Sequence, residues 1–433
     1  MSDSVAQVGS TKGIFKIRKH KKRKPEAREK NLSLILLLVF SLLFLVGFDF
    51  LKSGLPAKPK VRIAKTKEGD YQLLTRSVPF VIKGVCYSPV PIGKNYSYDF
   101  WQQDLEVFKK DAQLMQDMGV NAIRIYQPGP DIERTKEIIN YFYEEFGIRT
   151  IMGHWIGFWQ GTYPDYDNSE FRQSVKRDCL AMVNELKDTE GILLWVLGNE
   201  NNFSFGKQRL RLWSSLRLDE IKDPYKKRQA KAKVYYKFIN EIAACIKDID
   251  PDHPVALGNG GIDFIETAKE HSSHVDILAC SIYSGKSFGR LFSRVKDLWG
   301  KAFFISEFGS DSFNAHTKQP DEDMQTQFII SEWKEIERNL AGASGEGNCL
   351  GGVVFEWTDE WWKTEEYNPQ KWSIHDETAG WSNGAYYFDI AAEGNLNMNE
   401  EWWGIVRLVA EDGPDERIPK KVYYALEEYW SRD

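Results

Sequence analysis

Short apolar runs alternate with longer amphipathic stretches along most of this 433-residue chain. The runs are apolar on both faces, which is typical of parallel strands covered by helices. They predict eight strands, at residues 80–87, 121–126, 149–155, 192–197, 253–259, 275–283, 302–307 and 350–357. The amphipathic stretches predict helices at residues 105–118, 132–146, 170–186, 228–249, 262–270, 288–298, 324–340 and 420–430. This alternation favours an α/β fold of the (β/α)8 TIM-barrel type.

Two further patterns refine this architecture. A doubly wound open sheet is the alternative, but it would need a Gly-rich phosphate loop after an early strand, and the chain has none there. Residues 358–419 are too long for a plain loop. They contain Trp361, Trp362, Trp372, Trp381, Trp402 and Trp403. We therefore expect a Trp-rich insertion after strand eight, packed over the catalytic mouth of the barrel.

The N-terminal region predicts a membrane anchor. Residues 16–24 are strongly basic, and residues 32–48 are apolar and uncharged. Such a run spans roughly 26 Å as a helix, just enough to cross a bilayer. A cleaved signal peptide is the competing interpretation, but residues 49–52 offer no small-residue cleavage site.

The predicted organisation follows from that anchor. We expect a basic cytoplasmic tail at 1–31, a single transmembrane helix at 32–51, a stalk at 52–75 and a catalytic barrel at 76–433. Basic residues before the apolar run place the N-terminus in the cytoplasm. The barrel would then lie on the other side of the cytoplasmic membrane, in the periplasm or outside the cell. The lipid bilayer is then one partner of the chain.

Composition narrows the choice of other partners. The chain carries a net charge of −6 although its first 31 residues are basic, so the barrel is acidic. This argues against nucleic acid as a partner. The five cysteines are scattered, without a CxxC pair. We therefore expect neither a disulfide framework nor a structural zinc site, and no cofactor.

The ends of the predicted strands carry the candidate chemistry. Strand four is followed by Asn199 and Glu200 in the motif GNE, and strand seven ends at Glu307 in SEFG. Because strand ends converge at the mouth of a barrel, these two carboxylates can face each other. At a separation of about 5–5.5 Å they could perform retaining glycoside hydrolysis. The other strand ends offer Tyr87, Arg124, Tyr126, His154, Trp155, Tyr283, Glu356 and Trp357.

Electrostatics predicts how the two carboxylates divide the work. A nucleophile needs a low pKa, and a general acid needs a raised one. Arg124 beside Glu307 would keep that carboxylate charged, and the charge would in turn raise the pKa of Glu200. The clustered aromatic residues suit sugars, whose apolar faces stack on rings.

The GNE and SEFG motifs together resemble those of clan A glycoside hydrolases, most of all the catalytic domain of family 2. The stretch FVIKGVCYSP also resembles the first strand of the family 72 β-1,3-glucanosyltransferases. The resemblance covers about residues 79–430, and the predicted anchor and stalk stand where family 2 enzymes usually carry a β-sandwich.

The resemblance also implies site roles. Glu200 would be the acid/base and Glu307 the nucleophile, while Asn199 would hold the sugar 2-hydroxyl. Arg124 would lie beneath the nucleophile, Tyr283 would hydrogen-bond Glu307, and Trp357 would form the floor of the sugar site.

Three of these candidates have simpler interpretations. Arg124 could form an interior ion pair without a catalytic role. His154 is either a structural histidine or a substrate contact, and Glu356 either binds a sugar hydroxyl or pairs with a cation. We include both as substrate contacts.

The sequence thus predicts a membrane-anchored retaining β-glycosidase of carbohydrate metabolism, acting on an oligo- or polysaccharide. The alternatives are a β-glucan transglycosylase using the same site and a non-catalytic glycan-binding barrel. A metal-dependent hydrolase would need a His/Asp cluster at the strand ends, for which only His154 and His316 are candidates. We expect no metal.

Overall fold

A computed structural model of the chain describes residues 60–159, 163–206, 211–314, 317–363, 365–377 and 399–431. Within these residues, parallel strands close into an eight-membered barrel. In chain order they are β4 (Ile82–Cys86), β5 (Ala122–Ile125), β6 (Arg149–His154), β7 (Ile192–Leu197), β8 (Val255–Gly260), β9 (Ile277–Ser281), β10 (Phe303–Phe308) and β13 (Cys349–Val354). β13 closes the barrel by pairing with both β10 and β4. The predicted α/β barrel is confirmed.

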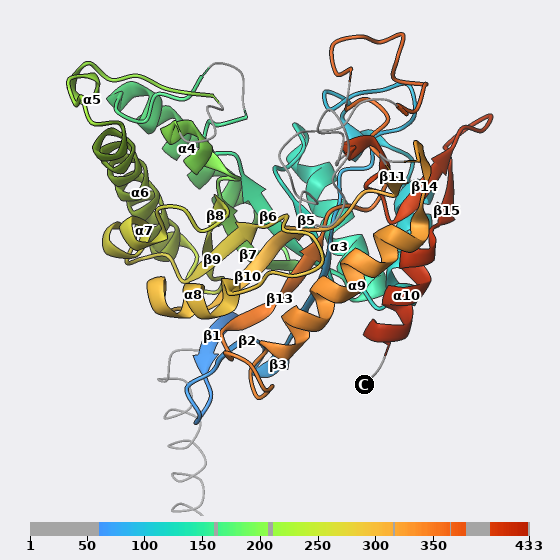
Figure 1. Cartoon of the computed structure of the whole chain (residues 1–433), viewed down its shortest axis with the longest axis horizontal. Coiled ribbons are helices and arrows are strands. Elements are labelled where there is room, and N and C mark those ends of the chain that lie inside the picture. The colour runs from blue at the N-terminus through green and yellow to red at the C-terminus, as the bar shows by residue number, and fades with distance from the viewer. Residues whose placement is uncertain are drawn as a thin grey trace, which may run out of the picture. The chain divides into compact units, whose positions relative to one another are not determined.

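Helices surround the barrel strands (Figure 1). They are α2 (Leu105–Met118), α3 (Ile132–Phe146), α4 (Ser169–Leu186), α5 (Leu216–Asp219), α6 (Pro224–Ile249), α7 (Ile265–His271), α8 (Leu291–Leu298), α9 (Glu322–Arg338) and α10 (Lys421–Trp430). Asp or Asn side chains cap the starts of α2, α3, α4, α6 and α9. Asp223 caps α6 by accepting a hydrogen bond from the Lys226 amide, and Pro224 occupies the first turn. For this reason α6 begins earlier than the predicted residue 228.

A small antiparallel sheet covers one end of the barrel. It consists of β1 (Val61–Lys65), β2 (Tyr71–Thr75) and β3 (Val78–Phe80), so residues 60–75 of the expected stalk carry its first two strands. Val61 donates its amide to the Asp252 carbonyl (2.9 Å), and the Tyr71 hydroxyl donates to the Gly300 carbonyl (2.7 Å). These acceptors precede β8 and β10. The sheet therefore covers the N-terminal ends of the strands and leaves their C-terminal ends, the mouth of the barrel, uncovered.

The predicted architecture is wrong in its transmembrane helix. Residues 32–51, where the sequence pattern placed that helix, lie outside the described residues, as do residues 1–31. Among the helices that are described, none is long and apolar enough to cross a membrane. Even α6, 26 residues long, has a strongly charged face, whereas a span needs about 20 mostly apolar residues. Among the described residues the fold is an α/β barrel. The expected bilayer contact and the placement at the cytoplasmic membrane rested on the predicted helix, and no described helix supports them.

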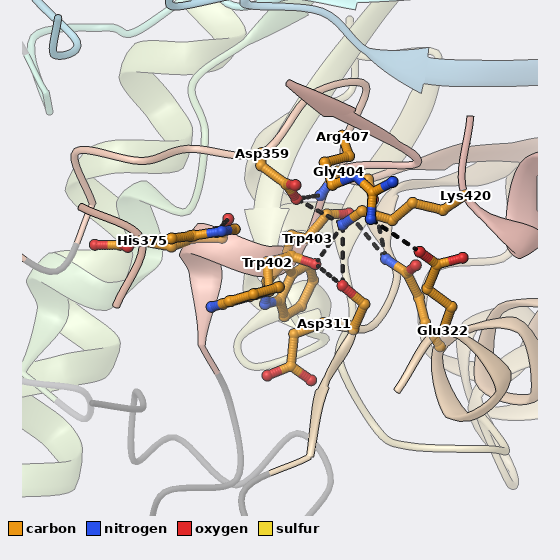
Figure 2. A network of polar contacts seen from close by, with 12 residues as sticks. Asp311, Glu322, Asp359, His375, Trp402, Trp403, Gly404, Arg407 and Lys420 are labelled. Atoms are coloured by element: carbon orange, nitrogen blue, oxygen red, sulfur yellow. Dashed lines mark hydrogen bonds and ion pairs between the residues drawn. The ribbon is translucent and has the colours of Figure 1, made fainter. Parts of the chain in front are cut away.

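The segment after β13 returns to the barrel through a buried polar network (Figure 2). It includes the 3-10 turn η4 (Glu400–Trp402) and the hairpin of β14 (Val406–Val409) and β15 (Glu416–Pro419). Lys420 Nζ donates to Asp359 Oδ1 (2.7 Å), to Ser312 Oγ (3.0 Å) and to the Trp402 carbonyl (3.2 Å). The Gly404 amide also donates to Asp359 Oδ1, at 2.9 Å. This network joins the beginning and the end of the insertion to the loop after β10.

We expect Lys420→Ala to destabilise the fold by about 3–5 kcal/mol, because it leaves the buried Asp359 carboxylate without its cation. The Lys420 and Asp359 side chains are 2% and 0% exposed. Lys421→Ala is the matched control, since the neighbouring Lys421 forms an exposed pair with Asp323. Urea unfolding should show a large midpoint shift for the first variant and none for the second. Equal midpoints for both variants would contradict the structural importance of the network.

Candidate active site

Arg124 lies at the centre of the mouth, buried at the C-terminal end of β5. Its Nη1 donates to Glu307 Oε1 (2.7 Å) and to the Ser306 carbonyl (2.9 Å). Its Nη2 donates to Asn199 Oδ1 (2.8 Å). One guanidinium therefore joins the end of β10 to the turn after β7.

Glu307, on β10, accepts two further hydrogen bonds. Tyr126 donates its hydroxyl to Oε1 (2.7 Å), and Tyr283 donates to Oε2 (2.8 Å). Burial is the main cause that raises the pKa of both tyrosines well above the ordinary value, so both hydroxyls stay protonated as donors. Together with Arg124, these donors hold the carboxylate in one orientation and complement its negative charge.

Glu200 stands on a tight turn directly after β7. Its φ is +61°, a left-handed conformation that a side-chain-bearing residue seldom adopts. Two asparagines support this turn. The Asn199 amide donates to Asn201 Oδ1 (2.7 Å), and Asn201 Nδ2 donates to the Trp155 carbonyl (3.0 Å). Asn202 exchanges two hydrogen bonds of 2.8 Å with the backbone of Gly260 at the end of β8. Asn201 and Asn202 therefore fix the turn that presents Glu200.

The Glu200 carboxyl has surroundings opposite to those of Glu307. Burial is the first cause that raises its pKa well above 4.5, and the charge of Glu307 is the second. Glu400 raises it further, while Arg124 and Lys363 lower it. Among the described residues, no hydrogen bond to another side chain holds this carboxyl. It is therefore suited to carry a proton near neutral pH, while Glu307 is surrounded by donors.

His154 ends β6 and is buried. Its Nδ1 accepts a hydrogen bond from the Ile156 amide (3.0 Å), and burial lowers its pKa to about 4. The ring is therefore neutral and helps to shape the loop after β6. His316 lies outside the described residues. Within the part of the chain that is described, no group of three or more His, Cys, Asp or Glu side chains is placed to hold a metal ion.

Trp357 and Glu356 follow β13 and are both buried. The Trp357 amide donates to the Cys86 carbonyl (3.0 Å) at the end of β4, and the Phe355 amide donates to the Phe308 carbonyl (2.7 Å) at the end of β10. These bonds place Glu356 between the two strand ends, directly beside the residue that follows Glu307. The structure thus brings the predicted residues to one mouth, while their contacts with a sugar remain predictions.

Two features of the site were not assigned from sequence. Tyr126 was noted only as the end of a strand, although it follows Arg124 by two residues and so shares its face of β5. A second group joins Glu360, Lys363 and Glu400. Lys363 Nζ lies 3.2 Å from Glu360 Oε2 and 2.8 Å from Glu400 Oε2. No short motif contains all three residues, so no local signal could have identified this group.

Comparison with known proteins adds evidence about the fold. No family model and no curated protein sequence matches the chain. Among solved structures, the chain is similar to a glycoside hydrolase family 2 β-galacturonidase from Eisenbergiella tayi (TM-score 0.53, 16% identity, covering 86% of this chain and 54% of that one). It is also similar to a β-D-glucuronidase from Dictyoglomus thermophilum (0.53, 16%, 87% and 54%) and to a β-glucuronidase from Bacteroides uniformis (0.56, 15%, 86% and 37%).

These similarities concern the fold alone, because the sequence identity is low. The chain spans about half of the length of the first two structures and less of the third. The predicted likeness to family 2 is supported at the level of the fold, and the likeness to family 72 stays a prediction.

The raised pKa of Glu200 predicts a pH-dependent effect of Glu200→Gln on stability. In the wild type, folding favours the protonated carboxyl. Its stabilising contribution is therefore complete below the unfolded-state pKa of 4.5 and is lost as pH rises through the folded-state pKa. Glutamine has the same shape and does not titrate, so the variant should gain in melting temperature relative to the wild type as pH rises from 4.5 to 8.

Glu133→Gln is the control for this measurement, because the Glu133 side chain is 76% exposed at the start of α3. Its melting temperature relative to the wild type should stay nearly constant over the same pH range. A constant difference for Glu200→Gln as well would contradict the raised pKa.

Proposed function

We propose that this chain is a retaining β-glycosidase that hydrolyses an O-glycosidic bond of a β-linked glycan by double displacement. The observation that carries the proposal is the pair of glutamates with opposite surroundings. Glu307 is held by Arg124, Tyr126 and Tyr283, whereas burial and the charge of Glu307 raise the pKa of Glu200. The shared fold with family 2 glycosidases supports the same chemistry.

In the first step, Glu307 attacks the anomeric carbon with its carboxylate. The bond from that carbon to the leaving oxygen breaks, and Glu200 transfers its proton to this oxygen. Arg124, Tyr126 and Tyr283 act as positioning residues, because they direct the Glu307 carboxylate. Asn199, whose Oδ1 accepts from Arg124, lies between the two glutamates and is proposed to donate through Nδ2 to the sugar 2-hydroxyl.

In the second step, water resolves the glycosyl-enzyme ester. Glu200 is now a carboxylate and takes a proton from water, whose oxygen bonds to the anomeric carbon as the bond to Glu307 breaks. Esterification has removed the Glu307 charge, which was one cause of the raised Glu200 pKa. The pKa of Glu200 is therefore lower in the intermediate, and a carboxylate is the form that a general base requires.

The remaining contacts are proposed from position. Trp357 is assigned to the floor of the sugar site, and Glu356 and His154 to contacts with sugar hydroxyls. A sugar hydroxyl in place of water would resolve the same intermediate by transglycosylation. A non-catalytic barrel is disfavoured because Glu307 is surrounded by donors and burial raises the pKa of Glu200.

Glu307→Gln should lower kcat/KM on aryl β-glycosides by on the order of 10⁴-fold, because the amide cannot form the ester. The measurement is a panel of aryl β-glycosides and β-linked oligosaccharides, with product analysis to separate hydrolysis from transfer. Glu133→Gln is the matched control and should keep wild-type rates. Full activity of Glu307→Gln, or no activity of the wild type on any member, would overturn the proposal.

Added azide should distinguish the two roles. In Glu200→Ala, substrates with a good leaving group still form the ester, and azide should resolve it to a β-glycosyl azide without needing a general base. In Glu307→Ala, azide should replace the missing carboxylate and give the α-glycosyl azide. We expect rate recovery of about 10-fold or more, within the range of general acid–base effects. Proton NMR identifies the anomer, and an α-azide from Glu200→Ala would show that the roles are reversed.

A further inference from the structure

The segment directly after β13, residues 356–363, forms one wall of the mouth and is here called the post-β13 segment. The backbone bonds of Phe355, the residue before it, to Phe308 and of Trp357 to Cys86 hold its first residues between the ends of β4 and β10. Cys86 is itself in contact with the site, since the Tyr126 hydroxyl that donates to Glu307 lies 3.4 Å from its sulfur. The post-β13 segment therefore begins next to the proposed nucleophile.

Several buried polar atoms of the post-β13 segment have no hydrogen-bond partner among the described residues. They include Glu356 Oε1, Trp357 Nε1 and Trp362 Nε1, on side chains that are 3%, 0% and 6% exposed. Folded proteins pair nearly all buried polar groups, so unpaired groups in a candidate site indicate a ligand that completes them. Acceptors and donors occur together here. A hydroxyl group can satisfy both, because it donates and accepts.

The charges beside these atoms are mainly negative. Lys363 is held between Glu360 and Glu400, and Arg124 is held by Glu307, so both cations already have a carboxylate partner. The Glu356 carboxyl adds hydrogen-bonding groups rather than charge, because burial first and the charge of Glu360 second raise its pKa well above 4.5.

The same charges reach the proposed catalytic pair. Beyond the effect of burial, Glu400 raises and Lys363 lowers the pKa of Glu200. Burial is also the first cause that raises the pKa of Glu360 to about 7, and Glu307 contributes to it. The charges of this wall would therefore also act on a sugar that is bound against Glu200 and Glu307.

On the basis of the proposed glycosidase function, we propose that the post-β13 segment and Glu400 form a sugar subsite that accepts units without a carboxylate and discriminates against uronides. The unpaired carboxyl oxygen and indole N–H groups match hydroxyl groups. A sugar carboxylate would instead meet Glu360 and Glu400, two carboxyl groups that share the single cation Lys363. Specificity then arises from repulsion of the wrong sugar as well as from contacts with the right one.

The test uses pairs of 4-methylumbelliferyl β-glycosides that differ only at C6, such as glucoside with glucuronide and galactoside with galacturonide. The member with the neutral CH2OH group should have a kcat/KM at least about 10-fold higher, because a sugar carboxylate in a partly buried site is repelled by two glutamates that share only one cation. Glu307→Gln run in parallel shows that the turnover belongs to this site.

A charge variant tests the wall itself. Glu400→Gln removes one negative charge and leaves Lys363 paired with Glu360, so it should narrow the preference for the neutral sugar by about 3-fold or more. Loss of folded protein would lower both rates equally and leave their ratio unchanged. Glu411→Gln, at an exposed position of the β14–β15 hairpin, is the control and should keep the wild-type ratio.

The possible results separate the two proposals. If the wild type prefers the neutral sugar and Glu400→Gln makes this kcat/KM ratio smaller, the subsite is supported. Glu307-dependent turnover that favours uronides overturns the subsite and leaves the glycosidase intact. A neutral preference that Glu400→Gln does not change overturns the assignment of discrimination to this wall. No Glu307-dependent turnover of any pair overturns the glycosidase, and the subsite with it.

Discussion

The buried contact between Arg124 and Glu307 is the interaction on which the rest of the site depends. A guanidinium inside a barrel carries a large desolvation cost unless its donors are paired. Here they reach the Glu307 carboxylate, the Ser306 carbonyl and Asn199. These hydrogen bonds of Arg124 link β5 with the end of β10 and with the turn after β7. The geometry of both proposed catalytic residues thus follows from keeping one cation paired.

The two glutamates have opposite surroundings although both lie at the mouth of one barrel. Glu307 is surrounded by donors, while Glu200 is presented on a left-handed turn without such partners. A residue in this conformation carries a backbone strain of order 1–3 kcal/mol, which persists only where neighbouring contacts hold it. The side-chain bonds of Asn201 and Asn202 supply these contacts. The strain and the raised pKa therefore have a common origin in the position of Glu200.

Much of the barrel could be predicted because buried strands and amphipathic helices each require a regular pattern of apolar residues in the sequence. Runs such as 192–197 and 303–308 are largely apolar strands of the barrel. Their C-terminal ends bring Glu200 and Glu307 to one mouth, and this placement does not depend on the conformation of the loops. The β1–β2 hairpin was also readable, since Val61 and Ile63 alternate with polar residues before a turn at Gly69. The prediction of a stalk at residues 52–75 did not take this alternation into account. The membrane helix was inferred from a single apolar run, which lies outside the described residues, and no described helix could cross a membrane.

The contacts of the insertion could not be predicted in this way. Glu360 lies only three residues before Lys363, but Glu400 reaches Lys363 from a distant part of the Trp-rich segment. Neither a strand nor a helix period relates such positions, so only the folded chain reveals the group. Strand-end residues are placed by the regular barrel, whereas loop residues are placed by tertiary contacts that leave no periodic signal.

The ion pair of Lys420 with Asp359 has a consequence for how such a barrel can diversify. It ties the start of the insertion to its end, so the chain enters and leaves this region at fixed points. Changes in length or composition between these points need not alter the pairing of β13 with its neighbours. The region can therefore vary like an exchangeable module, and the preference of the proposed sugar subsite can drift over evolutionary time while the barrel is retained.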